Sequence, residues 1–418
     1  MNLLYNAGIA IYDAATAVAS LRSRKIREML RGRRHTLATL ADERRRVAPD
    51  GYDVWIHAAS LGEFEQGRPL IERLRRERPD LRILLTFYSP SGYNVRHDYR
   101  QVDTVMYLPG DSPRDVRAFL DAAAPHMAIF VKYEFWGNLL EQLHERGVPT
   151  YIISSIFRPG QRFFKPAGEM WRRMLRSFSH LYVQDESSRR LLARIGVDNV
   201  TVAGDTRFDR VSDILRTTVD LPVIERFCRE GDPVFIAGSS WEPDEDVYIP
   251  WLRANSGVRA IIAPHQFDEA RLRRLVRRLG DGTCLMSEIK QTGRVPDGCR
   301  AIVVDSFGLL SSLYRYGDVA YIGGGFGTGI HNINEAAVYG IPVVFGPRHQ
   351  KFKEASDLIT LKGGFEIKGR DTFEAIMQRF SAEPAYRKTC GAAAGKYIKD
   401  NLGATDIIYN DLFTKQQQ

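Results

Sequence analysis

The sequence contains two successive series of short apolar runs, and helix-like segments separate most of the runs. The first series lies at 53–59, 82–89, 104–109, 127–133, 150–155 and 180–185. The second lies at 233–240, 258–265, 301–306, 319–325 and 341–346. The runs are apolar throughout instead of alternating with polar residues, which is typical of parallel strands covered by helices on both faces. The pattern predicts an α/β fold with two doubly wound, Rossmann-like domains that face a central cleft.

The domain boundaries follow from where this pattern starts, pauses and stops. A chain of 418 residues is long enough for two domains. We expect four parts: an N-terminal helical segment at 1–50, a first domain at 51–210, a second domain at 211–395, and a C-terminal helix at 396–418 that packs on the first domain.

The positive charge of the chain is concentrated near its N-terminus. Residues 21–46 hold ten Lys or Arg and three acidic residues, so most of the net charge of +8 lies there. An apolar segment precedes this basic one, and that order predicts a helix lying on an anionic membrane surface. We expect a peripheral protein bound to such a surface. An ordinary amphipathic surface helix is the alternative.

The spacing of cysteine and histidine residues indicates which metal and disulfide sites the chain can form. The four cysteines form no C-x-x-C pair, and the nine histidines form no metal-binding spacing. We therefore expect a reducing compartment, no metal and no cofactor. Because the charge outside residues 21–46 is nearly balanced, nucleic acid is not an expected partner.

In an open parallel sheet, ligands bind at the carboxyl ends of the strands. The first motif at such an end is His57-Ala-Ala-Ser60-Leu-Gly62-Glu63. Burial could raise the pKa of the Glu63 carboxyl into the range of a general base. A capping box, with Ser60 as N-cap and Glu63 at N3, explains the same residues equally well.

The second motif is Lys132-Tyr-Glu134-Phe-Trp136-Gly-Asn138. Charged groups beside aromatic rings suit a sugar, which presents apolar faces and a rim of hydroxyls. The alternative is a Lys–Glu pair with Trp136 in the core. We favour a functional site, because paired charges in an apolar context are uncommon without a role.

The third motif is a glycine-rich loop that joins the run 319–325 to a helix expected to begin near His331. Its glycines allow a phosphate or sugar to approach backbone N–H groups. Asn332 and Glu335 could hold ribose hydroxyls, or they could cap the helix. The other residues expected to outline a nucleotide pocket at strand ends are Ser239, Ser240, Pro264, His265, Phe307, Gly308, Gly325, Gly327 and Lys351.

The set and order of these motifs resemble the 3-deoxy-D-manno-octulosonic acid (Kdo) transferases, inverting glycosyltransferases of the GT-B fold. The resemblance covers nearly the whole chain and is carried by ten motifs in register, among them HAASLGE, KYEFWGN, GDTRFD, GSSWEPDE and GIHNINEAA. It implies CMP-Kdo as donor, the lipid A precursor lipid IVA as acceptor, and metal-independent transfer in lipopolysaccharide biosynthesis. It also implies a peripheral protein on the cytoplasmic face of the inner membrane.

Several site roles are carried over only through the resemblance. Glu63 matches the general base of the family, and Glu134 matches its second acidic residue. Asn332 and Glu335 match the CMP-binding end. Arg207 stands where many members have Lys, and Lys132 and Arg158 become candidates to pair with the Kdo carboxylate.

The chain also departs from the family pattern. Lys132 replaces a Glu, Gly137 replaces a Pro, and His265 stands where many members have Arg. Two alternatives to Kdo transfer are another GT-B or epimerase-like enzyme that uses a UDP-sugar, and a non-enzymatic basic protein bound to a membrane or RNA.

Overall fold

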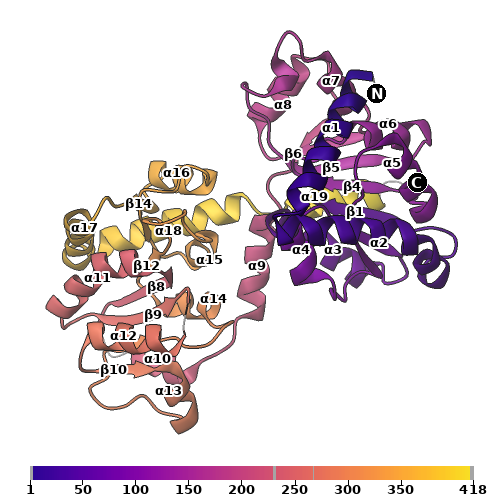
Figure 1. The fold of residues 1–418 in the computed structure, drawn as a ribbon. Helices are drawn as coiled ribbons and strands as arrows, with labels where there is room; N and C mark the ends of the chain where they lie inside the picture. Colours follow the sequence, from indigo (N-terminus) through magenta and orange to yellow (C-terminus); the bar gives the residue numbers. More distant parts are fainter. Residues whose placement is uncertain (1–2, 229–231, 267, 415–418) are drawn as a thin grey trace. The chain divides into compact units, whose positions relative to one another are not determined.

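The computed structural model describes residues 3–228, 232–266 and 268–414. It divides into two compact units (Figure 1). Unit 1 comprises Met1–Arg210 and Leu402–Gln418, and unit 2 comprises Val211–Asn401. Each unit is built on one seven-stranded sheet, and the described strand pairs are parallel. The predicted α/β fold with two doubly wound sheets is confirmed.

The sheet of unit 1 has the strand order β3-β2-β1-β4-β5-β6-β7. The strands are β1 (Val54–Ala58), β2 (Ile83–Phe87), β3 (Thr104–Tyr107), β4 (Ala128–Val131), β5 (Thr150–Ser155), β6 (His180–Val183) and β7 (Val200–Val202). The order reverses between β1 and β4. In doubly wound sheets this switch point is where ligands bind, so the loops after β1 and β4 define the candidate site.

Helices cover both faces of this sheet because neighbouring strand residues point to opposite sides. Trp55 and Phe130 belong to one core, and Ile56 and Val131 belong to the other. The helices packed on the first face are α5 (Pro113–Ala123), α6 (Gly137–Glu145), α7 (Glu169–Arg176) and α8 (Glu186–Ala193). Those on the second are α3 (Leu61–Glu77) and the C-terminal α19 (Ala404–Tyr409), while α4 (Pro90–Arg96) follows β2.

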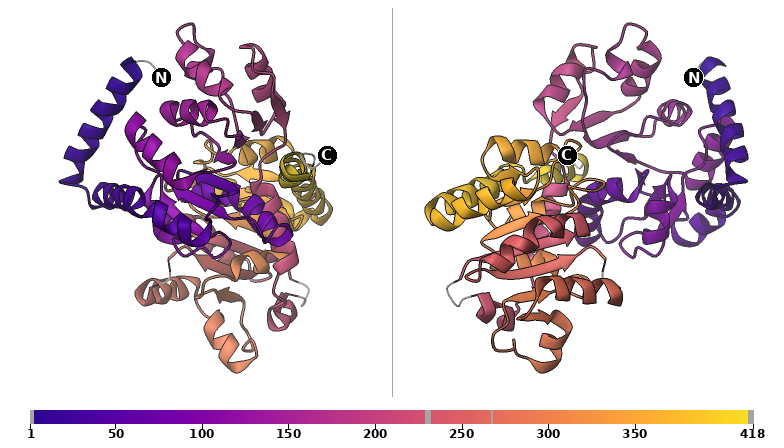
Figure 2. Two further views of the ribbon diagram at one scale, coloured as in Figure 1. Left: turned by 90° about the vertical axis from the view of Figure 1, so that its right-hand side faces the viewer. Right: turned by 60° about the vertical axis from the view of Figure 1, so that its left-hand side comes forward.

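Two helices precede the first strand. The first, α1 (Leu3–Ser20), packs on α2 (Arg24–Val47), which in turn packs on α5 and β3. In both views of Figure 2, α1 is an indigo helix at the periphery of unit 1. Within the described ranges, none of the helices combines the length and apolar character needed to cross a membrane.

The sheet of unit 2 has the order β10-β11-β9-β8-β12-β13-β14, with its switch point between β8 and β12. The strands are β8 (Val234–Ser240), β9 (Arg259–Pro264), β10 (Thr283–Leu285), β11 (Ala301–Val303), β12 (Val319–Ile322), β13 (Val343–Phe345) and β14 (Gly364–Glu366). Helix α9 (Arg207–Thr217) includes the residues at which unit 1 ends and unit 2 begins. The other helices of unit 2 are α10 (Pro222–Cys228), α11 (Glu242–Ala254), α12 (Glu269–Leu279), α13 (Met286–Thr292), α14 (Leu310–Leu313), α15 (Asn334–Ala337), α16 (Lys353–Thr360), α17 (Arg370–Ala382) and α18 (Pro384–Asp400).

The structure differs from the sequence expectation at the edges of the sheets. The strands β7, β10 and β14 were not predicted; each has three residues and lies at the end of a strand order. Edge strands bury less surface, so they lack the long apolar runs of central strands. The helix expected near His331 begins at Asn334 and is short. Unit 2 also extends to Asn401, beyond the expected 395, because α18 continues to Asp400.

Candidate functional site

The switch point of unit 1 brings the first two motifs together. The loop after β1 leads into α3, whose first turn carries Glu63, and the loop after β4 carries Lys132, Glu134 and Trp136. His57 on β1 is in register with Phe130 on β4, so the two chains leave the sheet side by side. Each motif lies at the carboxyl end of a strand, as expected, and the structure shows that the two strands are neighbours.

Glu63 has both of the features that the sequence suggested. Its Oε2 accepts hydrogen bonds from the Ser60 backbone N–H at 3.1 Å and from the Ser60 hydroxyl at 3.3 Å, so it caps the start of α3. Burial also raises the pKa of the Glu63 carboxyl, and the charge of Glu134 raises it further. The charges of His57 and Lys132 act in the opposite direction. A capping carboxylate can thus also have the raised pKa expected of a general base.

Glu134 lies at the end of a buried hydrogen-bonded chain. Its Oε2 accepts from Trp136 Nε1 at 2.6 Å and lies 3.0 Å from His57 Nε2. The Thr86 hydroxyl lies 2.9 Å from His57 Nδ1 and accepts from Trp55 Nε1 at 2.8 Å. His57 Nδ1 also lies 3.1 Å from the Thr86 carbonyl oxygen. Because a carboxylate only accepts, Nε2–H is the donor to Glu134. This chain fixes the orientation of the second carboxylate.

Lys132 has an unusual backbone conformation. Its φ of 71° lies in the left-handed region, which costs about 1 kcal/mol or more for a residue with a Cβ. Its N–H donates to Ile153 O at 2.9 Å, and its Nζ lies 5.4 Å from the centre of the Tyr133 ring. Strain of this kind is often retained at functional sites, and here it follows directly after β4.

Arg158 and Arg207 also lie on this edge of unit 1. Both charges lower the pKa of Tyr133, although burial raises it overall. Arg158 is exposed. Arg207 is paired with the buried Asp205 through Nη2 at 2.8 Å. Burial opposes ionisation of Asp205, but the Arg207 charge and hydrogen bonds from Arg207 and Gln66 outweigh it and keep that pKa below its ordinary value.

Asn138 is buried, and the protein itself uses both hydrogens of its amide. Asn138 Nδ2 donates to Asn6 Oδ1 at 2.8 Å and to Asp111 O at 2.6 Å. The residue was expected to bind substrate. These contacts instead assign it to the framework that holds the start of α6.

The arrangement in unit 1 supplies a carboxylate of raised pKa, a second carboxylate held in place, and a nearby cation. Such a set can remove a proton from a hydroxyl and hold a negatively charged sugar. His57, Glu63 and Glu134 share this region, yet no three His, Cys, Asp or Glu in the described part of the chain are grouped as metal ligands.

In unit 2 the switch point holds the glycine-rich loop, and the buried Asp244 fixes that loop. Asp244 accepts hydrogen bonds from Gly324 N at 2.8 Å, Trp241 N at 2.9 Å and the Tyr321 hydroxyl at 2.9 Å. Gly325 packs against Gly346, where an added Cβ would lie 2.6 Å from backbone atoms. These contacts fix the start of the loop, where Gly323, Gly324 and Gly325 are buried, whereas residues 326–329 are partly or fully exposed.

Aromatic and imidazole rings stack beside this loop. His265 stacks on both Trp241 and His331, and its ring centroid lies 4.5 Å from that of each. Trp241 Nε1 donates to His331 Nε2 at 3.2 Å, which leaves the proton of His331 on Nδ1. Burial lowers the pKa of His331 to about 4, and His265 contributes in the same direction. His331 is therefore a neutral hydrogen-bond donor at physiological pH.

The other residues predicted in unit 2 lie at the same carboxyl edge with different degrees of access. Asn332 donates to Glu335 Oε1 at 2.9 Å and accepts from Asn334 N at 3.1 Å, so this pair is joined at the start of α15. Ser240 is buried and bonded to Tyr248 at 3.0 Å, whereas its neighbour Ser239 is half-buried. The remaining members are the buried Pro264 and the exposed Phe307, Gly308 and Lys351.

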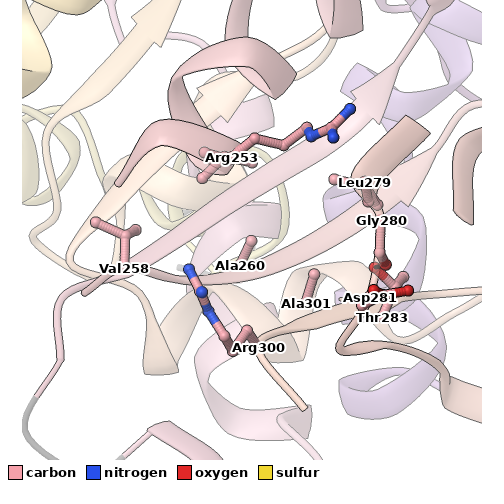
Figure 3. Close-up of a pocket in the computed structure, with 10 residues that line it drawn as sticks. Arg253, Val258, Ala260, Leu279, Gly280, Asp281, Thr283, Arg300 and Ala301 are labelled. Atoms are coloured by element: carbon pink, nitrogen blue, oxygen red, sulfur yellow. Dashed lines mark hydrogen bonds between the residues drawn. The ribbon is translucent and has the colours of Figure 1, made fainter. Parts of the chain in front are cut away.

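Two hollows of unit 2 lie at the opposite, amino edge of its sheet. One of 190 Å³ is bordered by Arg253, Asp281 and Arg300 (Figure 3). A second, of 370 Å³, is bordered by Arg226, Arg294 and again Arg300. None of the predicted site residues lines either hollow, so shape alone does not point to the carboxyl edge.

Several residues of the site were missed by sequence reasoning. His57 stands inside a motif that was recognised, but its contact with Glu134 depends on strand pairing. Tyr88, which follows β2, stacks on Trp136 with centroids 4.8 Å apart. Asp244 stands in the GSSWEPDE run, but its contact with Gly324 depends on how α11 packs beside the loop after β12.

Comparison with known proteins agrees with this geometry. The sequence profile of the family described as 3-deoxy-D-manno-octulosonic-acid transferase (kdotransferase) matches residues 25–210. The 3-deoxy-D-manno-octulosonic acid transferase of Bordetella pertussis is 27% identical over 384 residues, which is 86% of this chain and 87% of the relative. The same-named protein of Haemophilus influenzae is 25% identical over 376 residues, or 85% of each chain.

The fold also has solved counterparts. UDP-GlcNAc 2-epimerase from Neisseria meningitidis, bound to UDP-GlcNAc, superposes with a TM-score of 0.57 at 14% identity, covering 86% of this chain and 99% of the other. This similarity concerns the fold alone. Taken with the motifs of both units, the sequence matches support membership of the 3-deoxy-D-manno-octulosonic acid transferase family, and the chain is a glycosyltransferase with the GT-B fold.

Proposed function

We propose that the protein transfers Kdo from CMP-Kdo to lipid IVA, with inversion at the anomeric carbon and Glu63 as general base. The observation that carries this proposal is the Glu63 carboxyl. It lies at the switch point of unit 1, and burial and the Glu134 charge raise its pKa. The relatives named as Kdo transferases support Kdo as the transferred sugar.

The displacement follows from the groups at the two switch points. The hydroxyl of the acceptor loses its proton to the Glu63 carboxylate as its oxygen bonds to the anomeric carbon of Kdo. The bond from that carbon to the phosphate oxygen of CMP breaks, and CMP leaves with the electron pair. Donor groups beside the glycine-rich loop in unit 2, among them the Nδ1–H of His331, stabilise the phosphate without a metal. Lys132 and Arg158 are the candidates to pair with the Kdo carboxylate.

The test is the mass of the product after incubation with CMP-Kdo and lipid IVA. We expect the acceptor to gain one or more Kdo units, and Glu63→Gln to lower kcat by about 10²- to 10⁴-fold. Glu65→Gln is the matched control, since Glu65 lies on the same helix and pairs with Arg96 at 3.0 Å. Equal rates for Glu63→Gln and wild type would remove Glu63 as the base.

We also propose that the protein lies on the cytoplasmic face of the inner membrane through residues 1–46. Leu4, Ile11 and Val18 are 81%, 70% and 68% exposed, and their spacing of seven places them on one face of α1. Exposed basic side chains on the following segment suit anionic headgroups.

The membrane proposal is tested by sedimentation of the full chain with lipid vesicles. We expect binding to vesicles that contain anionic lipid and weaker binding to zwitterionic ones. A variant with Leu4→Ser and Ile11→Ser should lose most binding, and the double change Arg31→Glu and Arg34→Glu should lose the dependence on anionic lipid. Unchanged binding of both variants would count against this surface.

A further inference from the structure

Helix α1 makes few buried contacts, so a small number of polar bonds sets its position. Of its described side chains, Thr16 alone is buried. Among the described residues, side-chain hydrogen bonds join α1 to the sheet-bearing part of unit 1 at Tyr5, Asn6 and Tyr12. All of them reach elements next to the Glu134 loop.

Tyr5 caps the helix that follows this loop. Its hydroxyl accepts from the N–H of Gly137, the first residue of α6, at 2.9 Å and donates to Asp111 Oδ2 at 2.6 Å. The N-cap residue Trp136 makes no side-chain cap of its own. Asp111 also accepts from the N–H groups of Asn138 at 3.1 Å and Leu139 at 2.9 Å. A tyrosine from α1 and an aspartate thus satisfy the amides that the start of a helix leaves unpaired.

Tyr12 reaches the same loop from the other side. Its hydroxyl lies 2.6 Å from that of Tyr88, and the Tyr88 ring stacks on Trp136 at 4.8 Å. Trp136 Nε1 in turn donates to Glu134 Oε2 at 2.6 Å. Arg33 of α2 lies 4.1 Å from the centre of the Tyr88 ring and fixes it further.

We propose that Tyr5 and Tyr12 are positioning residues for the transfer reaction, which hold the segment 132–138 and so set the place of Glu134 relative to Glu63. The inference rests on the proposed function of that site. It gives α1 a second role beyond membrane contact: a helix whose apolar flank is exposed also orients a carboxylate of the reaction centre. Displacing α1 then changes the chemistry itself.

The test compares Tyr5→Phe and Tyr12→Phe with a matched control, Tyr52→Phe. Tyr52 lies in unit 1 and donates to Thr104 Oγ1 at 2.7 Å, at the amino edge of the sheet. The acceptor is supplied in detergent, so that a change in vesicle binding does not alter the rate. We expect kcat to fall by about tenfold in each α1 variant, because small displacements of reacting groups are costly, with the KM for CMP-Kdo unchanged.

A pH profile separates positioning from general loss of structure. Because the charge of Glu134 raises the pKa of Glu63, moving Glu134 away lowers that pKa. The acid limb of kcat/KM should therefore move to lower pH in the two α1 variants and stay in place in Tyr52→Phe. Tyr12→Phe and Tyr88→Phe should also be non-additive, since they remove the same contact.

Hydrogen exchange gives a readout that does not need the substrates. The amide of Gly137 should exchange faster in Tyr5→Phe than in wild type or Tyr52→Phe. If exchange there is unchanged, or if both variants keep the wild-type kcat and acid limb, the positioning role is wrong and α1 serves only for attachment. Absence of transfer by the wild type would refute the proposed function, whereas the exchange result would still decide whether Tyr5 holds this segment.

Discussion

Nε2 of His57 lies 3.0 Å from Oε2 of Glu134, and both side chains are buried. His57 is a strand residue, whereas Glu134 stands in the loop after the neighbouring strand. The contact therefore joins a loop carboxylate to the rigid sheet. The charge of Glu134 raises the pKa of Glu63. The bond that holds Glu134 in place therefore also affects the pKa of Glu63, the proposed base.

Replacing Glu134 by Gln should move the acid limb of the pH–rate profile to lower pH. Glu63 acts as a base only when it is ionised, so the rate falls below its pKa. The negative charge of Glu134 opposes that ionisation, and neutral Gln removes the opposition. The measurement is kcat/KM against pH, with Glu65→Gln as control. A limb that moved to higher pH would contradict the assignment of Glu63.

Replacing Lys132 by Met should have the opposite effect. The positive charge of Lys132 favours the ionised form of Glu63 and so lowers its pKa. Without that charge the acid limb should move to higher pH. If Lys132 also pairs with the Kdo carboxylate, the KM for CMP-Kdo should rise by about tenfold or more, whereas the affinity for CMP alone should not change. Lys165→Met, on an exposed part of unit 1, is the control.

Asp111 should titrate near pH 6 in the folded protein. Burial raises its pKa to about 6, although hydrogen bonds from Tyr5 and backbone amides act against the rise. A folded pKa above the unfolded value contributes stability at low pH, and this contribution is lost as the pH rises from about 4 to 6. The loss amounts to roughly 3 kcal/mol at most. Carboxyl ¹³C resonances, assigned with Asp111→Asn, measure the titration directly, and an ordinary Asp value would contradict it.

Much of this site could be predicted from sequence because its carboxylates directly follow long apolar strands. Glu63 and Glu134 were found in that way, and so was the glycine-rich loop. The contacts of His57 could not be found, since they need the registers His57↔Thr86 and His57↔Phe130, which bring together residues far apart in the chain. For Asn138, the sequence suggested a role that its contacts in the structure do not support. Its motif pointed to substrate, but its neighbours in space, Asn6 and Asp111, use its amide.

Gly325→Ala should damage the glycine-rich loop, while Gly327→Ala should be tolerated. A Cβ on Gly325 would lie 2.6 Å from backbone atoms of Gly346, which cannot move without shifting β13 and its loop. At Gly327 the nearest atom, Gly324 O, would be 3.5 Å away, an ordinary contact. We expect Gly325→Ala to weaken CMP binding at least tenfold and to destabilise unit 2 by about 1–3 kcal/mol. Calorimetric titration with CMP and thermal unfolding test both, and equal affinity of the two variants would show that the loop does not bind the nucleotide.

CMP should raise the melting temperature of the protein and UDP should not. A ligand that binds only the folded protein stabilises it by an amount that grows with its concentration relative to Kd, about 2.7 kcal/mol at a hundredfold excess over Kd. The experiment decides between a CMP-sugar and a UDP-sugar donor, since the fold alone is shared with a protein bound to UDP-GlcNAc. The charge of His331 does not change during the assay, because burial lowers its pKa to about 4 and it stays neutral. The shift caused by CMP should therefore not depend on the protonation of His331 between pH 6 and 8, and stabilisation by UDP but not CMP would overturn the proposed donor.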